Sequence, residues 1–477
     1  MTLTTIAFFI IFALAYRWFL SPNQRGWVLL IASEIFVFWI SPALSIPYLD
    51  IGLATVTIAL TVLVWWVTQS RTASLTTDDK ITLVLTIGVV LFLATLRYLL
   101  PSWRGLTPAL SVWPLLLALV GFGGVLFVTL VITRRFVKPV SAVWLLIALI
   151  VLLFIMLKTE PLAEALVTVL HQLTLPEDIL PAPLIWIGFS YVAFRWLHIL
   201  FDWRAGQLPV VSLRETLTYV LFFPAFLAGP IDRVESFSAD YRTLPALSVP
   251  ETTRLLDGGE RLLLGILKKF VIADSLTLLA LSPATAQHFT SPARGWLLLY
   301  IYGIRLFLDF SGYTDIAIGV GILLGIRLPE NFTRPYRKAN IAAFWRSWHI
   351  TLSNWVRFYI FAPLSRTLLR RHWPPLLVVF VAQVFSMLII GLWHGFTWSF
   401  AVWGLWHGLG LFMHKVWSDR TRRVYLRLRQ KPRLQKVWSV VGWFLTLQFV
   451  MLGWVWFVLP DVEQAAQVLL KLFGVGW

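Results

Sequence analysis

The chain has 477 residues, of which 58% are hydrophobic and 13% are charged, whereas an ordinary soluble domain carries roughly 25% charged residues. This composition excludes a water-soluble globular protein. The sequence has no cysteine, which also excludes catalysis by a thiolate, disulfide bonds and cysteine-ligated metal.

The formal net charge of +17 can serve binding to nucleic acid or to a membrane surface. The Lys and Arg residues lie in the segments between hydrophobic runs. This is the pattern of basic loops that face the cytoplasm and the anionic headgroups of a bilayer. The charge therefore predicts contact with membrane lipid and no binding to nucleic acid.

Apolar runs recur along nearly the whole chain, for example at 83–95, 115–133, 143–157 and 376–392. A helical crossing of the bilayer core needs about 20 mostly apolar residues, so the runs provide roughly eleven to thirteen transmembrane or re-entrant helices. They lack the alternation of polar and apolar residues found in membrane β-barrels. We therefore predict an all-α polytopic integral membrane protein, folded as a single membrane domain over residues 1–477.

The N-terminal part, residues 1–180, reads as a series of plain hydrophobic helices. Its first run, Ile6–Ala15, is not preceded by a basic residue and is expected to be a retained helix and not a cleaved signal. Glu34 stands out, because an acid inside a membrane helix is a candidate for function. It can equally be a protonated or hydrogen-bonded residue of the helix bundle.

The region 181–414 is the motif-bearing core. Polar, aromatic, Gly and Pro residues interrupt its apolar runs, as expected where helices break to line a cavity. Residues 415–436 contain nine Lys or Arg and one acid, which predicts a cytoplasmic loop. A C-terminal helix and tail follow over 437–477.

A second basic segment, with Arg366, Arg370 and Arg371, also predicts a cytoplasmic loop. The chain between the two basic segments, Pro374–Met413, must then cross and return. We expect a hairpin with its turn or kink around Gly391–Thr397.

The pentapeptide GLWHG occurs twice in this hairpin and supplies His394 and His407, thirteen residues apart. On one unbroken helix that spacing gives about 220° of rotation and about 20 Å of rise, too far for a shared metal ion. His394 lies where a long apolar run meets polar residues, so its pattern fits a cavity-lining and a packing residue equally. His407 lies within an apolar helix, which favours a hydrogen bond inside the bundle.

His349 follows a basic stretch that contains no acid, formed by Arg334, Arg337, Lys338 and Arg346. Arg side chains bind phosphate in a bidentate manner, so the stretch suits an anionic cytoplasmic ligand such as a phosphate-bearing donor. The alternative is an amphipathic segment that contacts lipid headgroups.

Charged residues also occur within the apolar run around Asp309. Arg305 and Asp309 are four residues apart on an expected helix and can neutralise one another. Asp315 follows nearly two turns later. We interpret the three as structural, with cavity lining as the alternative, and expect Asp202 and Arg204 to anchor a helix end.

Five motifs resemble the membrane-bound O-acyltransferase family, in family order and at family-like spacing. They are AGPIDR (228–233), DFSGYTDIAIG (309–319), LPENFTRPY (328–336), FWRSWHITLSNW (344–355) and GLWHG (391–395). The chain is most similar to the bacterial branch that contains alginate O-acetyltransferases and the D-alanyl transfer protein of teichoic acid modification. Arg305 departs from the neutral polar residue usual in relatives.

The resemblance implies a ring of membrane helices around a funnel whose thin centre joins the two faces of the membrane. It implies that His394 is the catalytic histidine and His349 the second motif histidine. The expected substrate-binding positions are Asn331 and Trp393 together with the four basic residues before His349. No metal and no bound cofactor are expected.

The expected activity is transfer of an acyl group, first of all acetyl, from a cytoplasmic thioester to a hydroxyl of an extracytoplasmic or exported polysaccharide. The donor is acyl-CoA or an acyl-carrier protein. An SGNH or esterase-like extracytoplasmic protein is the expected partner, and a bacterial cytoplasmic membrane the expected location. The alternatives are D-alanyl transfer to a teichoic acid-type polymer, an inactive scaffold of the family, or a transporter, although the sequence has no long internal repeat.

Overall fold

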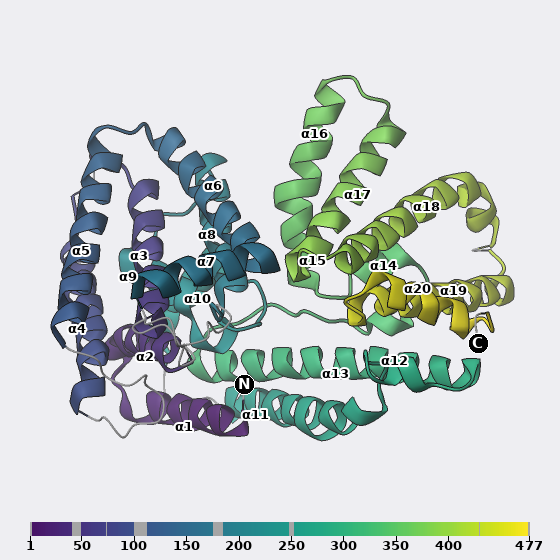
Figure 1. Cartoon of the computed structure of the whole chain (residues 1–477), viewed down its shortest axis with the longest axis horizontal. Helices are drawn as coiled ribbons and strands as arrows, with labels where there is room; N and C mark the ends of the chain where they lie inside the picture. The colour runs from purple at the N-terminus through teal and green to yellow at the C-terminus, as the bar shows by residue number, and fades with distance from the viewer. Residues whose placement is uncertain are drawn as a thin grey trace. The chain divides into compact units, whose positions relative to one another are not determined.

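The computed structural model describes residues 2–40, 49–72, 74–99, 112–174, 185–247, 252–428 and 430–475. These residues form helices joined by turns and short connections, with no strand among them (Figure 1), which confirms the predicted all-α fold. Seven of the described helices are long and apolar enough to cross a membrane. The chain is therefore a polytopic membrane protein.

The seven candidate spans are Ile51–Thr68, Thr77–Leu96, Leu117–Arg135, Pro139–Lys158, Pro292–Leu324, Pro375–His394 and Pro432–Val458. The sequence estimate of eleven to thirteen also counted re-entrant segments. Leu3–Phe19, an apolar helix of 17 residues, is shorter than these seven spans.

The described residues form two compact units, Met1–Gly259 with Ala317–Leu328, and Glu260–Ile316 with Pro329–Trp477. The first contains α1 (Leu3–Phe19), η1 (Pro22–Gln24), α2 (Arg25–Ile40), α3 (Leu49–Thr68), α4 (Thr77–Leu99), α5 (Val112–Arg135), α6 (Pro139–Lys158), α7 (Glu160–Thr174), α8 (Phe189–Arg204), α9 (Leu213–Leu221), η2 (Phe223–Ala225), α10 (Val234–Thr243), η3 (Leu244–Ala246) and the start of α11 (Thr252–Ile266). The second contains the end of α11, η4 (Leu267–Ala273), η5 (Thr277–Leu279), α12 (Thr285–His288), most of α13 (Pro292–Leu324), η6 (Pro335–Arg337), α14 (Ile341–Trp345), α15 (Ile350–Val356), η7 (Arg357–Phe361), α16 (Ala362–Arg370), α17 (Pro375–His394), α18 (Trp398–Leu428), α19 (Pro432–Val458) and α20 (Val462–Leu472).

Buried polar contacts hold the first unit together. Arg195 of α8 donates to the carbonyl oxygens of Val220 and Ala225, at 2.8 and 2.9 Å, where α9 gives way to η2. Trp196 donates to the Thr61 hydroxyl of α3 at 3.0 Å. These bonds satisfy polar groups that are costly to leave unpaired in an apolar interior.

Glu34 of α2 is completely buried in the first unit. The Thr86 hydroxyl of α4 donates to its Oε1 at 2.7 Å. This contact supports the interpretation of Glu34 as a hydrogen-bonded residue of the helix bundle.

The second unit contains the predicted hairpin. α17 ends at His394 and α18 begins at Trp398, so the turn lies within the predicted interval Gly391–Thr397. α17 and α18 pack closely against each other along the hairpin (Figure 1). The prediction of a turn at this position is confirmed.

The basic run 415–436 is not a loop. α18 continues through it to Leu428 and α19 begins at Pro432. Arg, Lys and Leu are good helix formers, and a helix of 31 residues is about 46 Å long, longer than the bilayer core. The basic residues up to Leu428 therefore continue the helix that begins at Trp398 instead of ending it.

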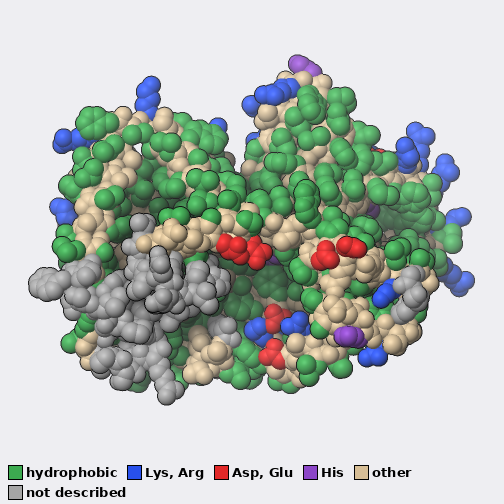
Figure 2. Space-filling model, in the orientation of Figure 1, with side chains coloured by type: hydrophobic (Ala, Val, Ile, Leu, Met, Phe, Trp, Pro, Cys, Tyr) green, Lys and Arg blue, Asp and Glu red, His purple; other side chains and the backbone are tan. Residues whose placement is uncertain are grey.

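Hydrophobic side chains cover much of the visible face of each unit (Figure 2). On α5, large side chains such as Val120 and Phe127 are 73% and 67% exposed. An apolar surface of this extent is typical of protein that faces lipid.

Candidate functional site

The glycines of both GLWHG copies bring α17 and α18 together. A side chain at Gly391 would collide with the carbonyl oxygen of Phe400, and one at Gly404 would lie 2.7 Å from the carbonyl oxygen of Met387. Only glycine permits so close an approach of two helix backbones. The glycines of the two copies therefore have the same packing role, whereas the two histidines lie in different settings.

His394 is the last residue of α17 and is half-buried. Its ring lies among four aromatic rings, with centroid distances of 4.5 Å to Trp393, 4.7 Å to Phe457, 5.7 Å to Trp403 and 5.8 Å to Phe400. Packing from three helices thus fixes the imidazole at the end of a helix.

His349 is held at the break between α14 and α15. Its backbone is left-handed (φ 42°), and its side chain is almost fully buried. The ring centroid lies 4.7 Å from that of Phe310 and 6.1 Å from that of Trp393. Burial lowers the pKa of His349, which lies outside the seven candidate spans, to about 3, so the imidazole is neutral at neutral pH.

Asn331 fixes the tautomer of His349. The Asn331 Oδ1 accepts from the backbone N–H and the hydroxyl of Thr351, at 3.2 and 2.7 Å. The His349 Nδ1 lies 3.3 Å from the same oxygen. Because an amide oxygen can only accept, Nδ1 must carry the proton, and Nε2 then presents a lone pair.

Two polar atoms at this place have no hydrogen-bond partner among the described residues. They are Asn331 Nδ2, a donor, and His349 Nε2, an acceptor. Buried polar atoms are nearly always paired in proteins, so such a donor and acceptor are suited to a ligand or to water. The sequence predicted both residues as part of the site, but not that these two atoms would lack a partner.

Trp393 brings the two motif histidines together. Its ring contacts that of His349 at 6.1 Å and that of His394 at 4.5 Å. The predicted catalytic residues, 45 positions apart in the sequence, therefore line one aromatic cluster. The sequence predicted both residues but not the tryptophan contact that joins them.

His407 has a different setting in the middle of α18. It is completely buried, and its Nδ1 accepts from Trp345 Nε1 at 3.4 Å. Its ring packs 4.9 Å from that of Trp403. The expected hydrogen bond within the bundle is confirmed.

The described residues contain no group of three or more His, Asp or Glu placed to hold a metal ion.

The basic residues before His349 keep their charges available. Arg334, Arg337 and Arg346 are exposed and Lys338 is half-buried, and none forms an ion pair with a described residue. The backbone between them is fixed by Tyr336, whose hydroxyl donates to the Gly303 carbonyl at 2.9 Å. This arrangement presents several cations from a rigid segment.

The predicted pairing of Arg305 with Asp309 is wrong. Lys269 pairs with Asp309, whereas Arg305 donates to the Thr277 hydroxyl at 3.0 Å. The π-helix η4 supplies the closer cation, since it runs beside α13 at this point. The two lysines within the apolar run LLLGILKKFVIAD indicated that acids of another helix would neutralise them, but not which acid each would meet.

Asp315 is also paired across these helices, at 2.6 Å from Arg261 and 2.5 Å from Lys268. The interpretation of Asp309 and Asp315 as structural residues agrees with these contacts.

In the first unit, Asp202 near the end of α8 contacts the AGPIDR motif, a partner that the sequence did not predict. It lies 3.3 Å from Arg233 and 3.5 Å from His198. His198 also accepts from the Val234 backbone N–H at 3.2 Å. His198 was not predicted as a functional residue, although its spacing of four residues from Asp202 on a helix was a signal.

Comparison with known proteins gives a consistent result. The family model of the membrane-bound O-acyltransferases matches residues 202–456, which include both motif histidines. The chain is 32% identical over 328 residues to a teichoic acid D-alanyltransferase of Streptococcus thermophilus, covering 65% of this chain and 73% of that one.

Two further relatives are shorter matches. The chain is 34% identical over 271 residues to a peptidoglycan O-acetyltransferase of Helicobacter pylori, covering 56% of this chain and 48% of that one. It is 31% identical over 295 residues to a protein of Azotobacter vinelandii named "Probable alginate O-acetylase", covering 61% and 54%. The matched region thus spans only about half of these two relatives.

Proposed function

The chain belongs to the membrane-bound O-acyltransferase family, and on that premise we propose that it transfers an acyl group, acetyl as first choice, across a bacterial cytoplasmic membrane. As a member it is a multi-pass membrane acyltransferase. The proposed donor is a cytoplasmic thioester, and the proposed acceptor is a hydroxyl of an extracytoplasmic polysaccharide. The observation that carries the proposal is the aromatic cluster in which His349 and His394 contact one tryptophan ring.

The distribution of charge supports a donor on the cytoplasmic side of the membrane and an acceptor on the other side. The basic ends of α16, α18 and α19 face the cytoplasm by the positive-inside rule, so the turn after His394 faces the opposite side. The exposed cations around Arg334 and Arg337 are suited to the phosphates of acyl-CoA, which we take as the first choice over an acyl-carrier protein.

In the proposed mechanism His394 acts as general base. It removes the proton of the acceptor hydroxyl while the oxygen attacks the thioester carbonyl carbon. The carbon–sulfur bond then breaks, and the thiol leaves with the proton. A positioned base of this kind contributes about 10²–10⁴-fold to the rate, and the surrounding aromatic rings exclude water that would hydrolyse the donor.

The tautomer of His349 refines the roles of its neighbours. The unpaired Asn331 Nδ2 is a donor and is the group suited to stabilise the oxyanion. The lone pair on His349 Nε2 instead accepts a hydrogen bond from the donor substrate and orients it. We therefore assign oxyanion stabilisation to Asn331 and positioning of the donor to His349.

D-alanyl transfer to a teichoic acid-type polymer is the second candidate. The specific observation in its favour is the similarity to the Streptococcus thermophilus protein. The match covers 73% of that protein, a larger share than in the other two relatives compared. An extracytoplasmic SGNH or esterase-like partner is proposed to assist the transfer in either case.

The test is His394→Ala in the purified protein, reconstituted in vesicles and supplied with labelled acetyl-CoA. We expect acyl transfer to fall about 10²–10⁴-fold with normal expression. The control is His372→Asn, because His372 is exposed with a left-handed backbone (φ 57°) that Asn tolerates. Wild-type turnover in the His394 variant would remove this residue from the mechanism.

A further inference from the structure

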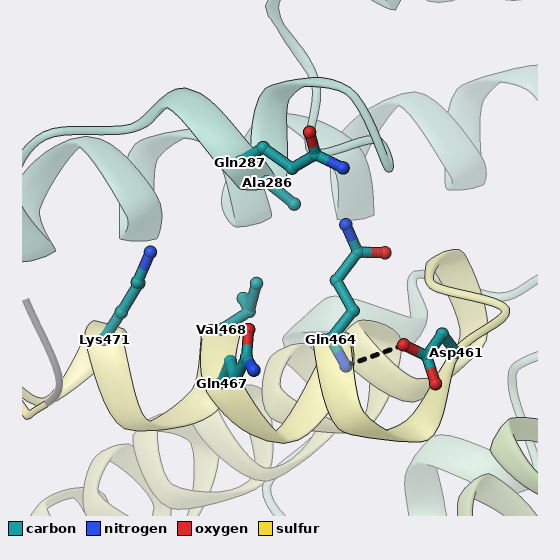
Figure 3. A pocket seen from close by; sticks show the side chains of 7 residues that line it. All are labelled: Ala286, Gln287, Asp461, Gln464, Gln467, Val468 and Lys471. Carbon is teal, nitrogen blue, oxygen red and sulfur yellow. Dashed lines mark hydrogen bonds between the residues drawn. The ribbon is translucent and has the colours of Figure 1, made fainter.

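A polar groove lies between α20 and the segment that carries α12 (Figure 3). Its volume is about 480 Å³. Its lining residues are Ala286, Gln287, Asp461, Gln464, Gln467, Val468 and Lys471. We call it the α20 groove.

Both walls of the α20 groove are held in place. Asp461 caps α20 by accepting from the backbone N–H groups of Glu463 and Gln464, at 3.1 and 3.2 Å. Gln464 Nε2 donates across to the Pro283 carbonyl at 3.2 Å. At the other end, Trp296 of α13 donates to the Leu472 carbonyl at 3.0 Å. The groove is thus shaped before any ligand enters.

Hydrogen-bonding groups dominate the lining. Gln464 and Gln287 point toward each other across the gap (Figure 3). The Gln287 amide makes no hydrogen bond with the described residues, and Gln467 makes only a long one, 3.5 Å, to Glu463. An amide offers two donors and an acceptor, which suits a hydroxyl-rich ligand and not an acyl chain.

The α20 groove begins close to the candidate site. The Phe457 ring lies 4.7 Å from that of His394, and Asp461 follows four residues later, at most about 14 Å away. The Ser399 hydroxyl donates to the Pro460 carbonyl at 2.9 Å, which ties the start of α18 to the start of α20. The groove therefore lies at the end of the hairpin turn, the side assigned to the acceptor.

We propose that the α20 groove binds a stretch of the acceptor polysaccharide, a few sugar units from the hydroxyl that is acylated. From Asp461 to Lys471 it follows α20 for about 15 Å, long enough for several units of a linear chain. One acid, Asp461, and one base, Lys471, stand at its two ends, so the lining favours a polymer through hydrogen bonds and not through net charge. The inference rests on the proposed function, because it assumes a polymeric acceptor.

The test is direct binding of labelled oligosaccharides to the full-length protein in lipid nanodiscs. The probes are oligomannuronate, soluble peptidoglycan fragments and teichoic acid. We expect the wild-type protein to bind one of them, and the double variant Gln287→Ala/Gln467→Ala to bind it about tenfold more weakly, since each lost hydrogen bond costs a few-fold in affinity. Gln430→Ala is the control, because Gln430 is exposed at the opposite, basic end of the unit.

The outcomes separate the two proposals. The proposal that the α20 groove binds polysaccharide is overturned by an unchanged dissociation constant in the double variant. It is also overturned if the wild-type protein binds none of the probes. Loss of a co-purifying partner protein with unchanged polysaccharide binding also overturns it, because the groove is then a protein-docking site. Polysaccharide binding without acyl transfer from labelled acetyl-CoA overturns the proposed function and leaves the groove standing.

Discussion

The two GLWHG copies place identical residues in two different parts of the hairpin. The glycines act alike, because Gly391 and Gly404 both allow α17 and α18 to approach. The histidines differ: the chain leaves the helix after His394, whereas α18 continues well beyond the completely buried His407. His394 thus ends a helix and is half-buried, whereas His407 lies inside the helix pair, where its Nδ1 accepts from Trp345.

The largest effect that can sharpen this comparison concerns His349. If His349 and His394 belong to one site, His349→Ala should lower acyl transfer about 10²–10³-fold, with the melting temperature changed much less. Asn331→Ala should do the same. The double variant should lose little more than either single one, because residues that act as a unit are not additive.

Steady-state turnover and the Michaelis constant for acetyl-CoA measure this cycle. Additive losses in the double variant would mean that Asn331 and His349 act independently. Turnover near that of the wild type in His349→Ala would leave His394 as the only functional histidine of the cluster.

Gly391→Ala tests whether the repeat glycines position His394. The added methyl group collides with the Phe400 carbonyl oxygen, so the helices must separate, at a cost of about 1–3 kcal/mol. We expect at least tenfold lower turnover and a lower melting temperature in detergent. The control is Gly121→Ala in α5, where a Cβ meets nothing within 4 Å; an equal loss there would remove the packing argument.

His407→Ala should separate stability from catalysis. It leaves the Trp345 donor unpaired and opens a cavity, for a cost of about 2–4 kcal/mol in the free energy of unfolding. We expect a clear drop in melting temperature and turnover within about threefold of the wild type for the folded fraction. His407→Asn can restore the acceptor and part of the stability. Loss of turnover comparable to that of His394→Ala would break the comparison.

The sequence predicted the elements that depend on local pattern. The apolar runs predicted helices, and the two basic segments with GLWHG predicted a hairpin that turns at Gly391–Thr397, which α17 and α18 confirm. The basic run 415–436 was mistaken for a loop, because charge reports the edge of the membrane and not the end of a helix.

Contacts between segments that are distant in the chain could not be predicted from the sequence. Nothing local could show that Lys269 and not Arg305 would neutralise Asp309, since the π-helix η4 that brings it there has no clear sequence signal. The role of Trp393 as the contact between His349 and His394 likewise depends on how α14, α15 and α17 pack. Single residues were predictable from motifs, and their partners were not.

The smallest expected effect concerns binding of the donor by the basic segment before His349, which lies outside both GLWHG copies. Arg337→Ala removes one exposed cation that has no ion-pair partner among the described residues, so it should raise the Michaelis constant for acetyl-CoA about three- to tenfold and leave the turnover number unchanged. Higher salt should weaken the effect, because exposed charges are screened. Arg366→Ala, an exposed arginine on α16, is the matched control. If both variants raise the constant equally, the cations act as a diffuse basic surface, and the segment before His349 has no special part in holding the donor.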